Sequence, residues 1–413
     1  MTTAWLGIPF FIGLAWLMSS RRDRFPLRTV LCGVAIQIGF ALLILRTSVG
    51  RDGMRWLSDR VTWFLDLADA GSMAIFGEAY RDHFFAFKVL PTIIFFSSFI
   101  SVLYYFGVIQ FVVRIFARVM MAILRTSGAE SLSASANIFV GQTEAPLLIR
   151  PYVAGMTQSE LMAVMTGGFA TVAGGVLAAY VGMGVSAGHL IAASVMSAPA
   201  ALAMAKIMIP ETEVSKTAGK VDLEVEIPYV NAIDAAATGA ADGLKLALNV
   251  GAMLLAFLAL IAVINEALLG PLGNLLNFLV LSRVDFLPEI VDLDLETLLG
   301  LLFAPIAWIM GVPWSEATTV GGLLGIKTAA NEFIGYERLA EMIRDDSLSE
   351  RSQIIATYAL CGFSNFSSIA IQIGGIGSIA PERKEDLARL GLRAMIAGTL
   401  ACFQTASIAG ILL

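Results

Sequence analysis

The sequence predicts an all-α integral membrane protein with about eight transmembrane helices, two re-entrant helical hairpins in inverted repeats, and interfacial helices. Three observations predict this fold: the composition, the length of the apolar runs and an internal repeat. Hydrophobic residues make up 57% of the 413 residues and charged residues only 15%, whereas a soluble domain carries about 25% charged residues. A net charge of −6 also offers no basic stripe for nucleic acid.

The chain opens with an apolar run at residues 3–18, which Arg21, Arg22 and Arg24 follow. A signal peptide carries its positive charges before the apolar stretch, so this run is predicted to be the first transmembrane helix. Further spans are expected around residues 29–45, 89–109, 160–183, 189–208, 244–264, 352–378 and 394–413. Residues 46–88 are amphipathic and are predicted to form helix in the headgroup layer.

Lysines and arginines near the helix ends predict the orientation in the membrane. The arginines after the first span put the first loop in the cytoplasm, and the basic residues at 114–125 and 383–393 agree with one alternating topology. That topology places both termini outside and the polar loop 211–228 inside. Four arginines disagree, because the same topology puts them outside: Arg46, Arg51, Arg55 and Arg60.

Two apolar segments, 130–153 and 296–336, carry polar residues, Gly and Pro in mid-segment. Such backbone at membrane depth has to be buried in protein or line a watery cavity, so each segment is predicted to be a re-entrant hairpin. An offset of 194 residues places ANIFVG at 136–141 on ANEFIG at 330–335, and GFAT at 168–171 on GFSN at 362–365. Inverted repeats with interrupted helices are typical of the midplane site of a secondary transporter.

Three carboxylates lie in these segments: Glu144, Glu332, and Glu316 at the expected tip of the second hairpin. A charged side chain at the bilayer centre costs from about 2.5 to more than 10 kcal/mol, so it usually faces a cavity and serves function. The polar residues expected beside them are Gln142, Thr143, Asn365, Ser367 and Ser368. Such donors and acceptors suit a neutral ligand rich in NH and OH groups.

Hard oxygens for a coupling ion come from Asn137, Thr171 and the backbone carbonyls that unwound helix frees. These residue types leave sodium and a proton equally open, and a proton carrier would be Glu144 or Glu332. A membrane-embedded hydrolase with Glu144 as its base is an alternative, but no nucleophile–His or metal-ligand pattern accompanies that residue. A passive channel is a second alternative, which accumulation of substrate against its gradient would exclude.

Four motifs resemble the concentrative nucleoside transporters over nearly the whole chain: ANIFVGQTEAPLL at 136–148, GVPWSEA at 311–317, KTAANEF at 327–333 and CGFSNFSSIA at 361–370. The resemblance implies sodium-coupled import of nucleosides such as uridine, cytidine and adenosine across the bacterial inner membrane. It implies a homotrimer in which a transport domain slides against a scaffold as an elevator, with no catalytic residue and with sodium as the coupling ion. A few relatives couple to protons instead.

By matching motif, the resemblance assigns the site residue by residue. The nucleobase would face Gly141, Gln142, Thr143, Glu144 and Val176. The ribose would bind Glu332, Asn365 and Ser368, with Phe363 beside it. Sodium would bind Asn137, Thr171 and the carbonyls of Val140 and Val172; some relatives have Ser at the Thr171 position, which keeps the hydroxyl ligand.

The resemblance also implies a division of the chain into four parts. Residues 1–125 are expected to be mainly scaffold helices with an interfacial helix, and residues 126–210 the first transport-domain repeat. Residues 211–295 are expected to hold the cytoplasmic loop with an interfacial and a scaffold helix, and residues 296–413 the second transport-domain repeat.

Overall fold

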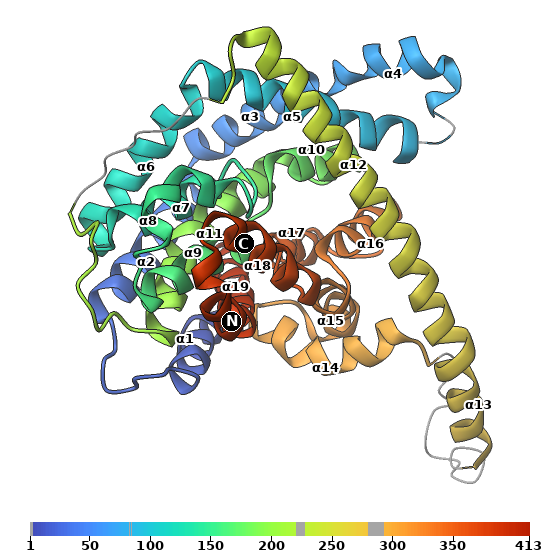
Figure 1. The fold of residues 1–413 in the computed structure, drawn as a ribbon. Helices are drawn as coiled ribbons and strands as arrows, with labels where there is room; N and C mark the ends of the chain where they lie inside the picture. Colours follow the sequence, from blue (N-terminus) through green and yellow to red (C-terminus); the bar gives the residue numbers. More distant parts are fainter. Residues whose placement is uncertain (1–2, 82, 84, 220–227, 280–292) are drawn as a thin grey trace.

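The computed structural model describes residues 3–81, 83, 85–219, 228–279 and 293–413, and this described part folds into helices without a strand (Figure 1). The all-α class is therefore confirmed. Predictions for residues 220–227 of the polar loop and for residues 280–292 fall outside the described residues.

The elements follow one another as short 3-10 or π-helical turns (η) and α-helices. In the first half they are η1 (Thr3–Leu6), α1 (Gly7–Leu17), α2 (Leu27–Ala41), η2 (Leu42–Arg46), α3 (Ser48–Asp66), α4 (Ala68–Phe76), η3 (Glu78–Arg81), η4 (Phe85–Val89), α5 (Leu90–Tyr105), α6 (Val108–Leu124), α7 (Gly128–Ala136), η5 (Ala145–Ile149), α8 (Arg150–Val153), α9 (Gln158–Ala170), α10 (Gly174–Gly182) and α11 (Ala187–Met208). In the second half they are α12 (Ala232–Val263), η6 (Ile264–Leu269), α13 (Gly270–Leu279), α14 (Leu295–Ile309), α15 (Trp314–Ala329), α16 (Glu332–Arg344), α17 (Glu350–Leu360), α18 (Phe366–Ile379), η8 (Pro381–Arg383) and α19 (Lys384–Leu412).

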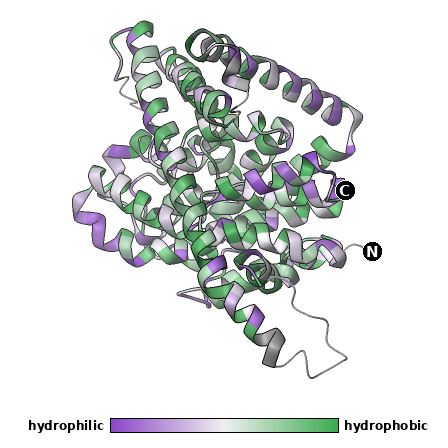
Figure 2. Cartoon of the chain, turned by 90° about the vertical axis from the view of Figure 1, so that its right-hand side faces the viewer, coloured by the Kyte–Doolittle hydropathy of each residue, from purple (hydrophilic) through white to green (hydrophobic). Residues whose placement is uncertain are grey.

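Six helical stretches of the described chain are long and apolar enough to cross a bilayer. They are Leu27–Arg46, Phe85–Tyr105, Gln158–Gly182, Ala187–Met208, Ala232–Leu275 and Pro381–Leu412, and each overlaps a predicted span. The other two predicted spans are helical but shorter, because α1 with η1 ends at Leu17 and because residues 361–365 interrupt α17 and α18. Figure 2 shows hydrophobic residues over most of the helical ribbon, with hydrophilic residues gathered on a few surface helices and connecting segments.

The amphipathic stretch after α2 forms α3, as predicted. Leu65 is the buried residue of α3, whereas Trp56 and Trp63 are exposed and the Arg60 guanidinium lies over the Trp56 ring. Aromatic and basic side chains on one solvent-facing helix are typical of an interfacial position. The placement of α3 in the headgroup layer stays a prediction.

Helices α5 and α12 pack closely on one another, and α12 runs along one side of the molecule (Figure 1). Gly239 and Gly243 allow this approach, because a Cβ atom at either glycine would collide with Ser97 or Ser101 of α5. Ser98 donates from Oγ to the carbonyl oxygen of Ala236 at 2.8 Å. Small residues at a helix contact are typical of membrane bundles.

The remaining long helices form a second body around α9, α11 and α19. Helices α1 and α2, which the sequence assigns mainly to the scaffold, pack against α11 and α19. Two local features favour this packing. A Cβ atom at Gly33 of α2 would lie 3.2 Å from the carbonyl oxygen of Pro199 in α11, which is a tight contact, and Gln37 of α2 hydrogen-bonds to Gln404 and Thr405 of α19.

The internal repeat is visible in the order of the elements. At the offset of 194 residues, α7, α9, α10 and α11 fall on α15, α17, α18 and α19. The breaks correspond too, since residues 171–173 separate α9 from α10 and residues 361–365 separate α17 from α18. Both copies therefore carry one discontinuous helix.

The segment predicted to be the second hairpin, residues 296–336, contains two breaks. Helices α14 and α15 bend by 117° at residues 310–313, and a second break at Ala330 and Asn331 separates α15 from α16. Because Asn331 corresponds to Asn137, α15 and α16 are the counterpart of the first hairpin, which α7, η5 and α8 form. Glu316 lies in the first turn of α15, shortly after the bend at residues 310–313; it is half-buried and accepts a hydrogen bond from Ser349.

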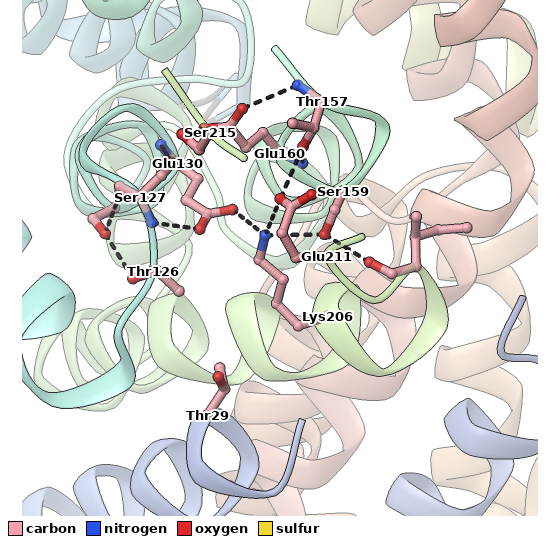
Figure 3. A network of polar contacts seen from close by, with 12 residues as sticks. Thr29, Thr126, Ser127, Glu130, Thr157, Ser159, Glu160, Lys206, Glu211 and Ser215 are labelled. Atoms are coloured by element: carbon pink, nitrogen blue, oxygen red, sulfur yellow. Dashed lines mark hydrogen bonds and ion pairs between the residues drawn. The ribbon is translucent and has the colours of Figure 1, made fainter. Parts of the chain in front are cut away.

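A buried polar network joins the starts of α7 and α9 to the end of α11 (Figure 3). The Lys206 ammonium on α11 lies 2.7 Å from the Glu130 carboxylate on α7 and 3.4 Å from that of Glu211. Ser215, in the segment that follows α11, donates to Glu160 on α9. Since a buried ammonium and carboxylate compensate one another's loss of hydration, this network fixes the loop after α11 to the base of the first hairpin.

Candidate functional site

Four interruptions of helix meet at the centre of the second body. They are the turns after α7, the break between α9 and α10, the break between α15 and α16, and the break between α17 and α18. Backbone hydrogen bonds join the first, second and fourth of them: Phe363 N donates to Thr171 O at 3.2 Å, and Gly174 N donates to Phe139 O at 3.3 Å. The third is joined by side chains, since the Asn365 amide donates to the Glu332 carboxylate at 3.0 Å. Irregular backbone is thus buried in protein, the condition under which membrane proteins tolerate it.

Glu332 is the first residue of α16, and its side chain is 4% exposed. Its carboxylate accepts from the Tyr180 hydroxyl and from the Asn365 amide, each at 3.0 Å and each on a different oxygen. A carboxylate offers about four lone-pair sites, so two acceptor positions remain for a ligand with hydroxyl groups.

Asn365 links this carboxylate to the start of α18. Its side-chain oxygen caps α18 by accepting from Ser368 N at 2.9 Å, and Ser368 Oγ accepts from the Gln142 amide at 3.3 Å. Gln142, Ser368, Asn365 and Glu332 therefore form one hydrogen-bonded chain across the two repeats. The structure brings these four predicted site residues together.

Two residues that the sequence reading missed hold this chain in place. Gln372 donates to the Gln142 oxygen and to the carbonyl of Met165, each at 3.0 Å, and Tyr180 donates to Glu332. Each offered a weak signal: Gln372 follows Ser368 by one helical turn, and Tyr180 is a hydroxyl within an apolar run.

Gly141 lies against the Glu144 side chain, because a Cβ atom at this glycine would collide with the carboxylate. Glu144 is exposed and, with Val140, lines a cavity of about 810 Å³. Tyr104 of α5 and Tyr229, which precedes α12, line the same cavity. Glu144 thus lies where the second body faces the α5–α12 pair.

The remaining predicted contacts flank the hydrogen-bonded chain. Thr143 packs against α18, where a Cβ atom at Gly375 would come within 2.8 Å of Thr143 Cγ2. Val176 is buried in the first turn of α10, and Phe363 is half-buried in the break before α18. Apolar side chains beside a polar cluster are typical of a pocket for a ligand with a flat ring.

The oxygens predicted to bind an ion lie at the break between α9 and α10. Asn137 donates its amide to Ser133 O at 3.0 Å, whereas its side-chain oxygen is buried and has no hydrogen-bond partner in the described part of the chain. Thr171 donates its hydroxyl proton to Gly167 O at 2.9 Å, which leaves the lone pairs of its oxygen open. In that same part, the carbonyls of Val140 and Val172 accept no backbone hydrogen bond outside the helices.

A buried polar atom left without a partner costs about 1–3 kcal/mol, so the Asn137 oxygen favours a ligand at this position. Neutral amide, hydroxyl and carbonyl oxygens are hard donors that suit a hard cation. The geometry therefore fits a small alkali ion.

Three regions of the chain match models of known protein families. Residues 6–79 match the model described as "Na+ dependent nucleoside transporter N-terminus", residues 86–187 match "Nucleoside recognition", and residues 189–410 match "Na+ dependent nucleoside transporter C-terminus". Together these matches cover most of the chain.

Individual relatives agree with the family models. Solute carrier family 28 member 3 is 44% identical in Eptatretus stoutii and 45% identical in Homo sapiens, over 98% of this chain. The chain spans 60% and 59% of the length of those two relatives. An uncharacterized transporter of Haemophilus influenzae is 47% identical over 98% of this chain and 96% of its own length.

Solved structures share the fold. CNTnw in an inward-facing substrate-bound state is 43% identical with a TM-score of 0.90, over 99% of this chain and 97% of that chain. A CNTnw variant in an outward-facing state is 42% identical with a TM-score of 0.91 over the same shares.

Proposed function

Because the chain belongs to the Na+ dependent nucleoside transporter family, we propose that it imports nucleosides by symport with sodium. The observation that carries this proposal is the hydrogen-bonded chain from Gln142 to Glu332, which lies beside the unpaired oxygen of Asn137. A transport function for the family also argues against the membrane-embedded hydrolase.

The ribose would bind Glu332, Asn365 and Ser368. Tyr180 and Asn365 already orient the Glu332 carboxylate, so its free lone pairs are preorganised for two sugar hydroxyls. The Phe363 ring would cover one side of the sugar. Preorganised acceptors favour binding because little side-chain freedom is lost when the ligand arrives.

The nucleobase would face the turns after α7. Gln142, held by Gln372, presents an amide that can both donate and accept, and Glu144 accepts from base NH groups. Gly141 leaves space beside the ring and Val176 provides an apolar contact. A pocket of this kind would admit both purine and pyrimidine nucleosides.

Sodium would couple to the nucleoside through this same turn. Asn137 and Val140 would bind the ion, whereas Gly141 and Gln142, which follow them directly, would bind the base. An ion that orders the turn therefore lowers the free-energy cost of ordering it for the nucleoside. Two ligands that share one conformational cost bind with positive cooperativity.

Transport would follow an elevator mechanism in a homotrimer. The packing supports a mobile body that includes α1 and α2 as well as both repeats, and a scaffold built on the α5–α12 pair. The outer face of α12 exposes Leu244, Leu248 and Leu255, which would contact lipid or another subunit. Pro228 and Tyr229, at the end of the 211–228 loop, line the cavity beside Glu144; with that loop in the cytoplasm of a bacterial cell, this cavity would belong to an inward-facing state.

Uptake of labelled uridine into proteoliposomes tests this function. We expect accumulation above the external concentration with an inward sodium gradient and little uptake when choline replaces sodium. Equal uptake in both media with dependence on a pH gradient would assign the coupling to protons. Uptake that only equilibrates would indicate a channel.

A further inference from the structure

Lys327 lies in the last turn of α15, and its side chain is fully buried. Its ammonium donates to the carbonyl oxygen of Ala359 at 2.8 Å. Among the described residues, no carboxylate lies within 4.0 Å of it, in contrast to buried Lys206, which contacts Glu130 and Glu211. Because a buried charge without a compensating partner is strongly unfavourable, something else has to stabilise this ammonium.

Two features of its surroundings supply negative potential. Ala359 belongs to the last turn of α17, whose terminal carbonyls have no further turn of helix to bond with because the chain breaks at residues 361–365. The C-terminus of a helix carries a partial negative charge. The second feature is the buried carboxylate of Glu332, the first residue of α16, because it and Lys327 in the last turn of α15 flank the same break at Ala330 and Asn331.

The two repeats differ at this point. In the first repeat, the side-chain oxygen of Asn137 is unpaired and open to an ion. In the second repeat, the corresponding Asn331 accepts from Ile334 N at 3.0 Å, and Asn365, which corresponds to Thr171, accepts from Ser368 N at 2.9 Å. Because both of these side-chain oxygens cap helices, neither is free to bind a cation. The second repeat has the Lys327 ammonium near its break, whereas the first repeat has an unpaired oxygen at the corresponding position.

We infer that Lys327 is a positioning residue for ribose recognition. Its ammonium supplies the positive charge at the break of the second repeat, whereas the corresponding break of the first repeat would bind sodium. The Lys327 ammonium stabilises the terminal carbonyls of α17 and the negative charge of Glu332, so that the carboxylate faces the sugar hydroxyls without a second ion. This inference rests on the proposed function, since it assigns Glu332 to the ribose.

A double-mutant cycle tests this role, with uridine binding measured by calorimetry on purified protein at saturating sodium. The single variants are Lys327→Gln, which retains a donor for Ala359, and Lys327→Met, which does not. Each is combined with Glu332→Gln. We expect either neutral variant to weaken uridine binding at least tenfold in the wild-type background and less than threefold in the Glu332→Gln background. Lys327→Arg, which keeps the charge, is expected to retain most of the affinity.

Lys206→Gln is the matched control, because it neutralises a lysine that is also buried but lies outside the site. It is expected to lower the melting temperature and to leave uridine affinity within threefold of wild type. Equal losses from Lys327→Gln in the two backgrounds, or unchanged affinity in the first, would overturn the inference. So would a failure of both neutral variants to fold, since it would assign Lys327 to stability. If wild-type protein binds no nucleoside, it is the proposed function that fails.

Discussion

Replacing Glu332 by Gln tests the ribose site directly, because it keeps the shape of the side chain and removes one acceptor oxygen. In the free protein each carboxylate oxygen accepts one hydrogen bond, from Tyr180 or from Asn365. The amide can satisfy only one of these donors well. That loss is present with and without nucleoside, so it lowers stability but largely cancels from the binding free energy.

The change in affinity therefore reports the sugar hydroxyl that loses its acceptor. A hydrogen bond to a charged group is worth about 1.5–3 kcal/mol net, and about 1.4 kcal/mol corresponds to a factor of ten. We expect uridine affinity to fall roughly ten- to a hundredfold. The 3′-deoxy analogue makes one bond fewer and should lose less.

Calorimetry of uridine and 3′-deoxyuridine against wild type and Glu332→Gln closes the cycle. Glu316→Gln is the matched control, since this carboxylate is half-buried, lies in the first turn of α15 and accepts from Ser349, away from Tyr180 and Asn365; it should leave both affinities unchanged. An unchanged ratio of the two ligands in Glu332→Gln would show that Glu332 does not contact the 3′-hydroxyl. Glu332 would then serve to hold the hairpin against α10 and α18.

Three further changes test other parts of the molecule. Thr171→Ala should raise the sodium concentration for half-maximal uptake more than it weakens uridine affinity at saturating sodium; the opposite order would remove Thr171 from the ion site. Gly141→Ser has to displace the Glu144 carboxylate and fills space beside the base, so competition assays should show a larger loss for adenosine than for uridine; a larger uridine loss would contradict that position. Glu130→Ala leaves the Lys206 ammonium with fewer partners and should lower the free energy of unfolding by about 3 kcal/mol. Lys245→Ala, at an exposed ion pair, should change it by less than about 1 kcal/mol. Equal shifts in thermal melts would contradict the structural role of the polar network around Lys206.

Local sequence patterns predicted most of the architecture. Apolar runs located the spans because a bilayer crossing needs about 20 successive apolar residues, and the amphipathic pattern located α3. The offset of 194 residues paired residues 168–171 with 362–365, and the structure interrupts a helix at both places, whereas the span predicted at 352–378 was continuous. The bounds of the second hairpin stay a prediction, because polar residues mark an interrupted segment without showing which of its two breaks is the counterpart of the first hairpin's turn.

The division of the helices between the two bodies was also beyond the sequence. Hydropathy shows that α1 and α2 are apolar, but it does not show which neighbour they pack against. That choice depends on the shape at Gly33 and on the hydrogen bonds of Gln37 with α19, whose partners lie more than 360 residues away. Contacts of such separation leave no periodic pattern in one chain.

The sequence by itself determined the membrane class and the repeat, and it predicted which residue types form the candidate site, because each depends on residues within a few turns of helix. Only the tertiary structure decided that Gln142, Ser368, Asn365 and Glu332 form one hydrogen-bonded chain, that Tyr180 and Gln372 hold it, and that Lys327 lies buried at the end of α17. The physical reason is that hydrogen bonds are directional over about 3 Å, whereas these partners lie as much as 230 residues apart and meet only when four helix breaks converge.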